Sequence, residues 1–107
     1  MTSKLIQITK TLIIDYTQIE YCKGLNNYTE IYIIDGTVKL VSVTLKCIEM
    51  ILEEVYFVRI TKSILINLDR VRYVENRGKK ITMYSGEVFL VPRTRTDCLM
   101  SFIKYTC

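Results

Sequence analysis

Residues 57–68 read Phe57-Val58-Arg59-Ile60-Thr61-Lys62-Ser63-Ile64-Leu65-Ile66-Asn67-Leu68, and Arg70 and Val71 follow closely. The stretch is apolar and basic at once. It must bury its aliphatic side chains while Arg59 and Lys62 stay within reach of an anion. Charged side chains are seldom fully buried unless they are paired, so a plain core strand rarely carries them. The pattern therefore indicates a β scaffold that presents cations.

The rest of the sequence is typical of a single domain spanning residues 1–107. With 107 residues and 50% hydrophobic content, the chain can build a core without disulfides or metals. No apolar run approaches the roughly 18 to 20 residues of a membrane span, and the first residues do not begin a signal peptide. We expect one cytoplasmic domain with no membrane association.

Residue inventory argues against most catalytic sites. The sequence has no histidine, which excludes a Ser-His-Asp triad, a Cys-His dyad and a histidine metal cluster. The four glycines stand alone, so no phosphate-binding glycine loop is present. The scattered cysteines lack any Cys-x-x-Cys pair, and we expect free thiols, with Cys22 and Cys47 as small core residues. We therefore predict no enzyme, no cofactor and no metal.

Positive charge is concentrated in the second half of the chain. Residues 1–58 carry five lysines against seven acidic residues, a net charge of −2, whereas residues 59–95 carry nine basic residues against three acidic ones, a net charge of +6. A polyanion-binding face needs this polarity, because each neutralised phosphate releases counterions. A basic surface kept only for solubility is the alternative.

Short apolar runs rich in Val, Ile, Thr and Tyr recur between turn signals and predict a mainly β domain. The predicted strands are 4–8, 11–15, 19–23, 28–34, 37–41, 56–60, 70–75, 80–84 and 87–91. Turns are expected at Asp35-Gly36, Arg77-Gly78 and Ser85-Gly86. Helical spacing predicts one amphipathic helix over 44–55, capped by Thr44, and a short C-terminal helix from near Thr96.

Taken in order, these features resemble the LytTR family of bacterial DNA-binding output domains over about residues 19–102. The resemblance is carried by these segments: Ile19-Glu20-Tyr21-Cys22-Lys23, Asn27-Tyr28-Thr29, Asp35-Gly36, Thr44-Leu45-Lys46, the Phe-x-Arg-Ile-x-x-Ser pattern at 57–63, Ile66-Asn67-Leu68, Val71, Ser85-Gly86 and an Arg-bearing segment before a final helix. Single motifs here are weak, but their joint order and spacing are specific.

The resemblance implies an elongated, three-sheet β fold with one amphipathic helix and a short C-terminal helix. Its loops would read successive major grooves of double-stranded DNA, at direct-repeat promoter sites, as part of a transcription regulator. The further partners it implies are a second copy on DNA and a receiver domain or partner protein outside this chain. The reading positions carried over are Asn26, Asn27, Tyr28, Thr61, Lys62 and Arg93.

The residues support these positions by their own chemistry. Lys62 and Arg93 are cations in polar bends, and arginine can pair bidentately with guanine. Arg93 and Arg95 follow Pro92 and, being two apart, would share one face of an extended segment. A second basic set flanks Gly78 in a turn, where it either contacts phosphates or stays solvated: Arg77, Lys79 and Lys80.

Each position also has a structural interpretation. Asn26-Asn27 is a favoured turn dipeptide, and Tyr28 could pack within a strand. Thr61 and Ser63 could cap the bend. We interpret Arg59 first as a structural residue, either a snorkelling side chain or an internally paired one, that orients this bend and does not touch DNA. Asn67 is expected to satisfy backbone groups.

The chain departs from the family pattern at three positions. It has Lys23 where many members carry Glu, Thr61 where many carry His, and Pro92 where Ser often precedes the reading Arg. Base preference should therefore differ from that of other members.

Two other functions remain open from the sequence. A β-rich protein-interaction module could use the same basic face to bind an acidic partner. A single-stranded nucleic-acid binder would need exposed aromatic rings beside the cations. The tyrosines that keep this reading open are Tyr21, Tyr28, Tyr32, Tyr73 and Tyr84.

Overall fold

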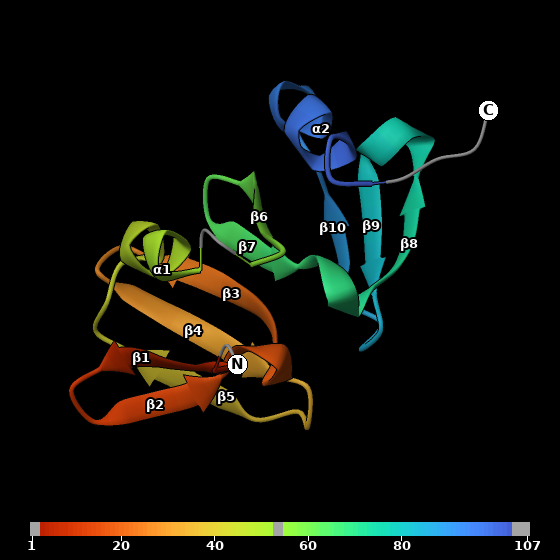
Figure 1. The fold of residues 1–107 in the computed structure, drawn as a ribbon. Coiled ribbons are helices and arrows are strands. Elements are labelled where there is room, and N and C mark those ends of the chain that lie inside the picture. The colour runs from red at the N-terminus through yellow and green to blue at the C-terminus, as the bar shows by residue number, and fades with distance from the viewer. Residues whose placement is uncertain (1–2, 53–54, 104–107) are drawn as a thin grey trace.

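The computed structural model describes residues 3–52 and 55–103 (Figure 1). The strands are β1 Leu5–Thr9, β2 Leu12–Asp15, β3 Ile19–Leu25, β4 Tyr28–Ile33, β5 Val38–Val41, β6 Phe57–Thr61, β7 Ile64–Asn67, β8 Val71–Glu75, β9 Lys80–Met83 and β10 Val88–Leu90. The α-helices are α1 Leu45–Ile51 and α2 Arg93–Met100, and the short 3-10 helices are η1 Tyr16–Gln18, η2 Leu68–Arg70 and η3 Asn76–Gly78. The predicted mainly β fold with two helices is confirmed.

The strands form three antiparallel sheets. One pairs β1 with β2, one has the order β5–β4–β3–β7–β6, and one has the order β10–β9–β8. The molecule measures 45 × 35 × 24 Å along its principal axes. These observations confirm the elongated, three-sheet arrangement that the family resemblance implies.

The five-stranded sheet is the middle layer, with a hydrophobic core on each face. One core lies between this sheet, the β1–β2 hairpin and α1. The other lies between the same sheet, the three-stranded sheet and α2. Figure 1 shows α1 and β1–β2 in the left part of the view, and α2 with β8–β10 in the upper right part. The middle strands are therefore covered on both faces, so their side chains are anchored in two directions.

This double burial explains β7, a strand that the sequence patterns do not predict. Leu65 belongs to the core beneath α1, whereas Ile64 and Ile66 belong to the core beneath α2. Because both faces of the strand are buried, its apolar residues run continuously and do not alternate with polar ones. A continuous apolar run of three residues, Ile64–Ile66, gives no period-2 signal.

The predicted turns lie where expected and join β4 to β5, β8 to β9 and β9 to β10. At the first, the Asp35 carboxylate accepts hydrogen bonds from the backbone N–H and the hydroxyl of Thr37, at 2.9 and 2.7 Å. These bonds lower the pKa of Asp35. Gly36 follows with a φ of 95°, which suits a residue without Cβ.

Helix α1 begins as predicted, because the Thr44 hydroxyl accepts a hydrogen bond from the Cys47 N–H at 3.3 Å. Residues 53 and 54 of the predicted helix lie outside the described residues. Helix α2 corrects the prediction, since it begins at Arg93 and not near Thr96. Pro92 occupies the N-cap with a φ of −59°, the value to which its ring restricts it. No helix in the described ranges is long and apolar enough to span a membrane.

The cysteines are partly as predicted. Cys22, Cys47 and Cys98 are free thiols. Cys22 is buried in the core beneath α1, and burial raises the pKa of its thiol to about 12. Cys47 is exposed, so the expectation of a core residue was wrong there. It lies on the outer side of α1, between the buried Leu45 and Ile48. Cys107 lies outside the described residues.

Candidate nucleic-acid interface

The β3–β4 turn presents Asn26, Asn27 and Tyr28 to solvent. Leu25 and Tyr28 pair across the turn, which leaves the two asparagines as its central residues. Asn26 has a φ of 57°, a conformation that asparagine tolerates better than most residues. Tyr28 is 49% exposed, so it does not serve mainly as a packing residue. All three side chains are therefore available to a ligand at the end of the β3–β4 hairpin.

The β6–β7 bend lies beside this turn and presents Lys62. The Thr61 hydroxyl accepts a hydrogen bond from the Ser63 N–H at 3.1 Å, which confirms that Thr61 caps the bend. The Gly24 N–H donates to the Ser63 carbonyl at 2.8 Å. This backbone bond extends the β3–β7 pairing and ties the bend to the β3–β4 turn. Lys62 is exposed between them.

Arg59 orients the bend, as predicted. Its Nη1 donates to Glu49 Oε1 of α1 at 3.0 Å, and its Nη2 donates to the Lys62 carbonyl at 2.6 Å. The guanidinium thus joins the helix to the tip of the bend. Its Nε is buried and has no partner among the described residues. Arg59 is committed to internal contacts and is not a free DNA ligand.

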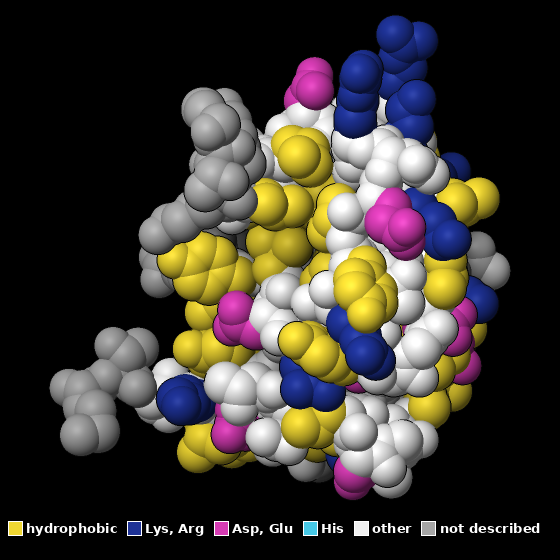
Figure 2. Space-filling model, turned by 90° about the vertical axis from the view of Figure 1, so that its right-hand side faces the viewer, with side chains coloured by type: hydrophobic (Ala, Val, Ile, Leu, Met, Phe, Trp, Pro, Cys, Tyr) yellow, Lys and Arg dark blue, Asp and Glu magenta, His cyan; other side chains and the backbone are white. Residues whose placement is uncertain are grey.

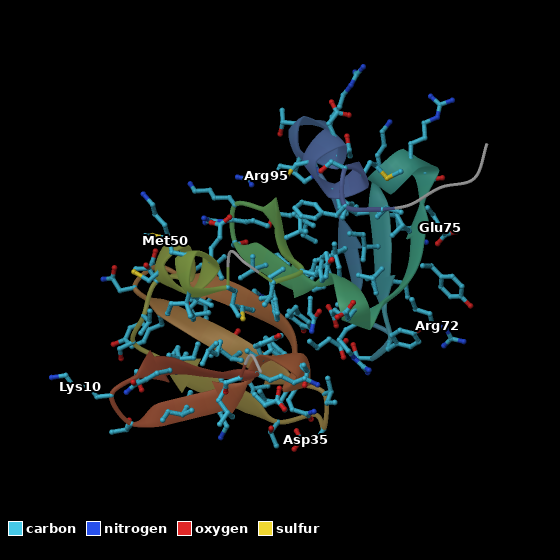
Figure 3. The ribbon with its side chains drawn as sticks, in the orientation of Figure 1. Lys10, Asp35, Met50, Arg72, Glu75 and Arg95 are labelled. Carbon is cyan, nitrogen blue, oxygen red and sulfur yellow. The ribbon has the colours of Figure 1, made fainter. Side chains whose placement is uncertain are left out.

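Helix α2 separates the two arginines that were predicted to share a face. In a helix, residues two apart point about 200° away from each other. Arg95 is half-buried, and its Nη1 donates to the Arg59 carbonyl at 3.3 Å. Figure 3 shows Arg95 pointing towards the β6–β7 bend. Arg93 is exposed in the first turn of the helix. Of the two, Arg93 is the one open to a ligand.

The η3 turn places its basic residues beside α2. Asn76, Arg77 and Gly78 all have positive φ, at 54°, 59° and 89°. A Cβ on Gly78 would lie 3.1 Å from Met100 Cγ, so the turn packs tightly on the end of α2. Arg77 and Lys79 are exposed at this corner. Lys80 is different, because it is half-buried in β9 opposite Glu75.

These elements form a continuous series along one side of the molecule. Helix α2 contacts β6 on one side and η3 on the other. In Figure 1 the β6–β7 bend lies between α1 and α2 along the upper edge. Figure 2 shows Lys and Arg side chains gathered at the upper end, over η3 and α2. We call these exposed residues the basic strip: Asn26, Asn27, Tyr28, Lys62, Arg93, Arg77 and Lys79.

The tyrosines divide into two groups. Tyr21 and Tyr32 stack on each other with ring centroids 4.3 Å apart, and Tyr21 is buried, which raises its pKa. Tyr73 and Tyr84 are exposed, but each has an arginine over its ring. Arg72 lies 5.3 Å from the Tyr73 centroid and Arg70 lies 5.1 Å from that of Tyr84. Figure 3 shows Arg72 pointing outward, away from β8. Tyr28, the fifth of these tyrosines, is 49% exposed and is the only one of the five in the basic strip, so the strip offers a single ring for base stacking.

Two residues that the sequence analysis does not name as candidate DNA contacts also belong to this region. Glu49 is the ion-pair partner of Arg59. Lys46, at the start of α1, lines one groove together with Asn26, Arg59 and Lys62. Both were visible only as outward positions on the amphipathic helix. No local pattern relates them to the bend, because strand pairing creates that proximity.

Comparisons with known proteins agree with this architecture. The sequence profile of the LytTr DNA-binding domain matches residues 9–104. A solved LytTr DNA-binding domain from Bacillus cereus, described as part of a methyl-accepting/DNA response regulator, superposes with a TM-score of 0.75. It shares 14% sequence identity, and the match covers 97% of this chain and 100% of that one. No curated protein matches the sequence. Since the profile spans most of the chain, this protein belongs to the LytTr family of DNA-binding domains.

Proposed function

We propose that this chain is a single domain that binds double-stranded DNA sequence-specifically and regulates transcription in a bacterium. The β3–β4 turn, the β6–β7 bend and the start of α2 would enter the major groove. The observation that carries this proposal is the adjacency of three exposed elements on one rigid side: Asn26 and Asn27, then Lys62, then Arg93.

The geometry supports different roles along the basic strip. Arg93 is exposed at a helix start and suits base contact, because its guanidinium can pair with guanine O6 and N7. Arg77 and Lys79 lie at the far end, on η3, and suit phosphate contact, which positions a protein without reading sequence. Arg95 donates a hydrogen bond to the Arg59 carbonyl, so we assign it the role of positioning α2. Lys80 lies in β9, outside the η3 turn, and its charge suits long-range attraction of DNA.

Partners follow from the small size of this surface. One domain offers few base contacts, so useful specificity calls for two adjacent sites read by two copies. We propose direct-repeat promoter sites and a homodimer formed on DNA. A receiver domain or a partner protein outside this chain would control that assembly.

Selection from a random duplex pool tests the proposal. The chain is incubated with the pool, bound duplexes are amplified over several rounds, and the selected duplex is compared with a scrambled one across a salt series. We expect a short enriched motif, repeated in the same orientation, and tighter binding of the selected duplex at every salt concentration. Salt-sensitive binding without enrichment would overturn sequence-specific reading and favour an acidic protein partner for the same surface.

A further inference from the structure

A polar groove lies between the β3–β4 turn, the start of α1 and the β6–β7 bend. Asn26 lines it from the turn, Lys46 from the helix, and Lys62 and Ser63 from the bend, with Arg59 also among its lining residues. Asn26, Lys46, Lys62 and Ser63 are all exposed. Three segments more than 15 residues apart in sequence thus place polar groups around one open space.

The walls of this groove are held in place by named contacts. The Gly24 N–H to Ser63 carbonyl bond joins the turn to the bend. The Arg59 guanidinium joins the bend to α1 through Lys62 and Glu49. At Gly24 the backbone of β3 approaches α1 closely, because an added Cβ would lie 3.0 Å from Leu45 Cβ. A ligand would therefore meet a preformed site, with little ordering cost.

The charge of the groove selects an anion. Lys46, Arg59 and Lys62 are its cations, and none of the described residues that line it is acidic. Within residues 3–52 and 55–103, the Glu49 carboxylate is paired with Arg59 at 3.0 Å. No ion pair of Lys46 or Lys62 is found among the described residues, so their ammonium groups face the groove without a carboxylate partner there. The Asn26 amide and the Ser63 hydroxyl add neutral hydrogen-bond donors.

We propose that this groove binds one phosphate of the DNA backbone, with Lys46 as its principal cation. The inference rests on the proposed function, because the groove adjoins two of the three reading elements. A phosphate held there fixes how deeply the turn and the bend enter the major groove. Phosphate contacts set orientation and register, and base contacts then specify the sequence. Lys46 therefore positions the domain through the phosphate and does not itself contact a base.

Paired substitutions test the role of Lys46. Lys46→Gln removes one cation of the groove, and Lys39→Gln removes a lysine that is also exposed but lies in β5, outside the groove lining. We expect Lys46→Gln to weaken selected and scrambled duplexes by the same factor and to reduce the salt slope by about 0.9. A change of about 0.9 in slope means that the affinity deficit of Lys46→Gln relative to wild type should be roughly eightfold larger at about 0.1 M salt than at about 1 M. Lys39→Gln should change neither quantity. Equal behaviour of the two variants would overturn the proposal.

A second measurement locates the phosphate. Single methylphosphonates, which are uncharged, replace the phosphates of the selected duplex one at a time. One methylphosphonate position should weaken binding of the wild-type chain. The same substitution should not weaken binding of Lys46→Gln any further. Full additivity of the variant with every substitution would rule out the assigned contact. Thermal unfolding of both variants checks that the exposed substitutions leave the fold unchanged.

Failure of the proposed function is distinguishable from failure of this inference. If the wild-type chain binds selected and scrambled duplexes alike, sequence reading fails in the wild-type arm, and the register role of the groove fails with it. If the wild-type chain prefers the selected duplex and Lys46→Gln matches Lys39→Gln, only the groove assignment is wrong.

Discussion

Arg59 of β6 and Arg93 and Arg95 of α2 have different surroundings, and these give each arginine a different role. Arg59 is bound to Glu49 and to the Lys62 carbonyl. Arg95 is bound to the Arg59 carbonyl, whereas Arg93 faces solvent. Exposure and existing partners therefore decide which cation is free for DNA, and residue type alone does not.

The first prediction separates base reading from phosphate anchoring. Arg93→Ala should cost about 1–3 kcal/mol on the selected duplex and much less on a scrambled one, so sequence preference relaxes. Lys79→Ala should weaken both duplexes alike and reduce the salt slope by about one. Binding isotherms over a salt series measure both effects. Identical behaviour of the two variants would show that this division of roles is wrong.

The second prediction concerns the fork of Arg59. Arg59→Lys keeps the charge, but a single ammonium cannot reproduce the two directed bonds of the guanidinium. We expect a folded protein with reduced preference for the selected duplex, because the tip carrying Lys62 is less well held. Glu49→Gln is the control, since it removes the ion pair and leaves the bond to the Lys62 carbonyl. The pair is partly exposed, so its loss should cost under about 1 kcal/mol of stability. A larger loss of preference in Glu49→Gln than in Arg59→Lys would contradict this account.

At the scale of elements, α2 connects the bend to the η3 turn. Its first turn carries Arg93, its buried Thr96 and Leu99 face the core, and its end packs on Gly78. An eight-residue helix gains little stability from its own backbone, so packing must hold it in place. The contact with η3 therefore determines where both Arg93 and the η3 cations lie.

The third prediction tests that contact. Gly78 and Gly86 have similar φ values of 89° and 96°, but only a Cβ on Gly78 would meet a neighbour, Met100, whereas nothing lies within 4 Å of one on Gly86. Gly86→Ala should cost about 1–2 kcal/mol, from the left-handed backbone alone. Gly78→Ala should cost more, because it also pushes the turn away from α2. Urea unfolding measures both variants, and equal losses would show that the Met100 contact contributes nothing.

At the scale of the whole molecule, the basic strip depends on how the five-stranded and three-stranded sheets are held together. Glu20 on β3 is 3% exposed, and its Oε1 accepts a hydrogen bond from the Ser85 N–H in the β9–β10 turn at 3.2 Å. Nearby, Tyr21 meets Phe89 edge to face with ring centroids 4.9 Å apart. These contacts fix the three-stranded sheet, which leads into α2 and Arg93, relative to the five-stranded sheet, whose β6–β7 bend carries Lys62.

The fourth prediction tests this connection between the sheets. Glu20→Ala should lower the free energy of unfolding by about 1–3 kcal/mol, because the Ser85 N–H loses its hydrogen-bond acceptor. Glu20→Gln keeps an oxygen at the same place and should recover most of that loss. Chemical denaturation gives the stabilities, and binding of the selected duplex shows whether the two planes still act together. If both variants were equally destabilised, the charge of Glu20 and not its acceptor would be what matters.

The sequence by itself determined the local features of this protein: the mainly β class, the three glycine turns, the first helix with its Thr44 cap, and the internal roles of Arg59 and Asn67. Asn67 binds the Ile19 carbonyl at 2.9 Å and caps η2 through the Asp69 N–H, so it satisfies backbone groups as expected. Such features follow from short-range propensity, capping and turn chemistry, which neighbouring residues carry.

Only the tertiary structure decided which of these features meet. Strand β7 pairs with β3, with Ile64 opposite Lys23, and this register places the bend beside the asparagine turn. The same fold brings Lys46 to that turn and bend, and the buried Thr96 and Leu99 hold α2 against the core. Contacts between residues far apart in sequence depend on strand order and on burial of both sheet faces. A local sequence pattern contains no information on strand order or on burial of both sheet faces. The tertiary fold therefore determined the basic strip and its groove.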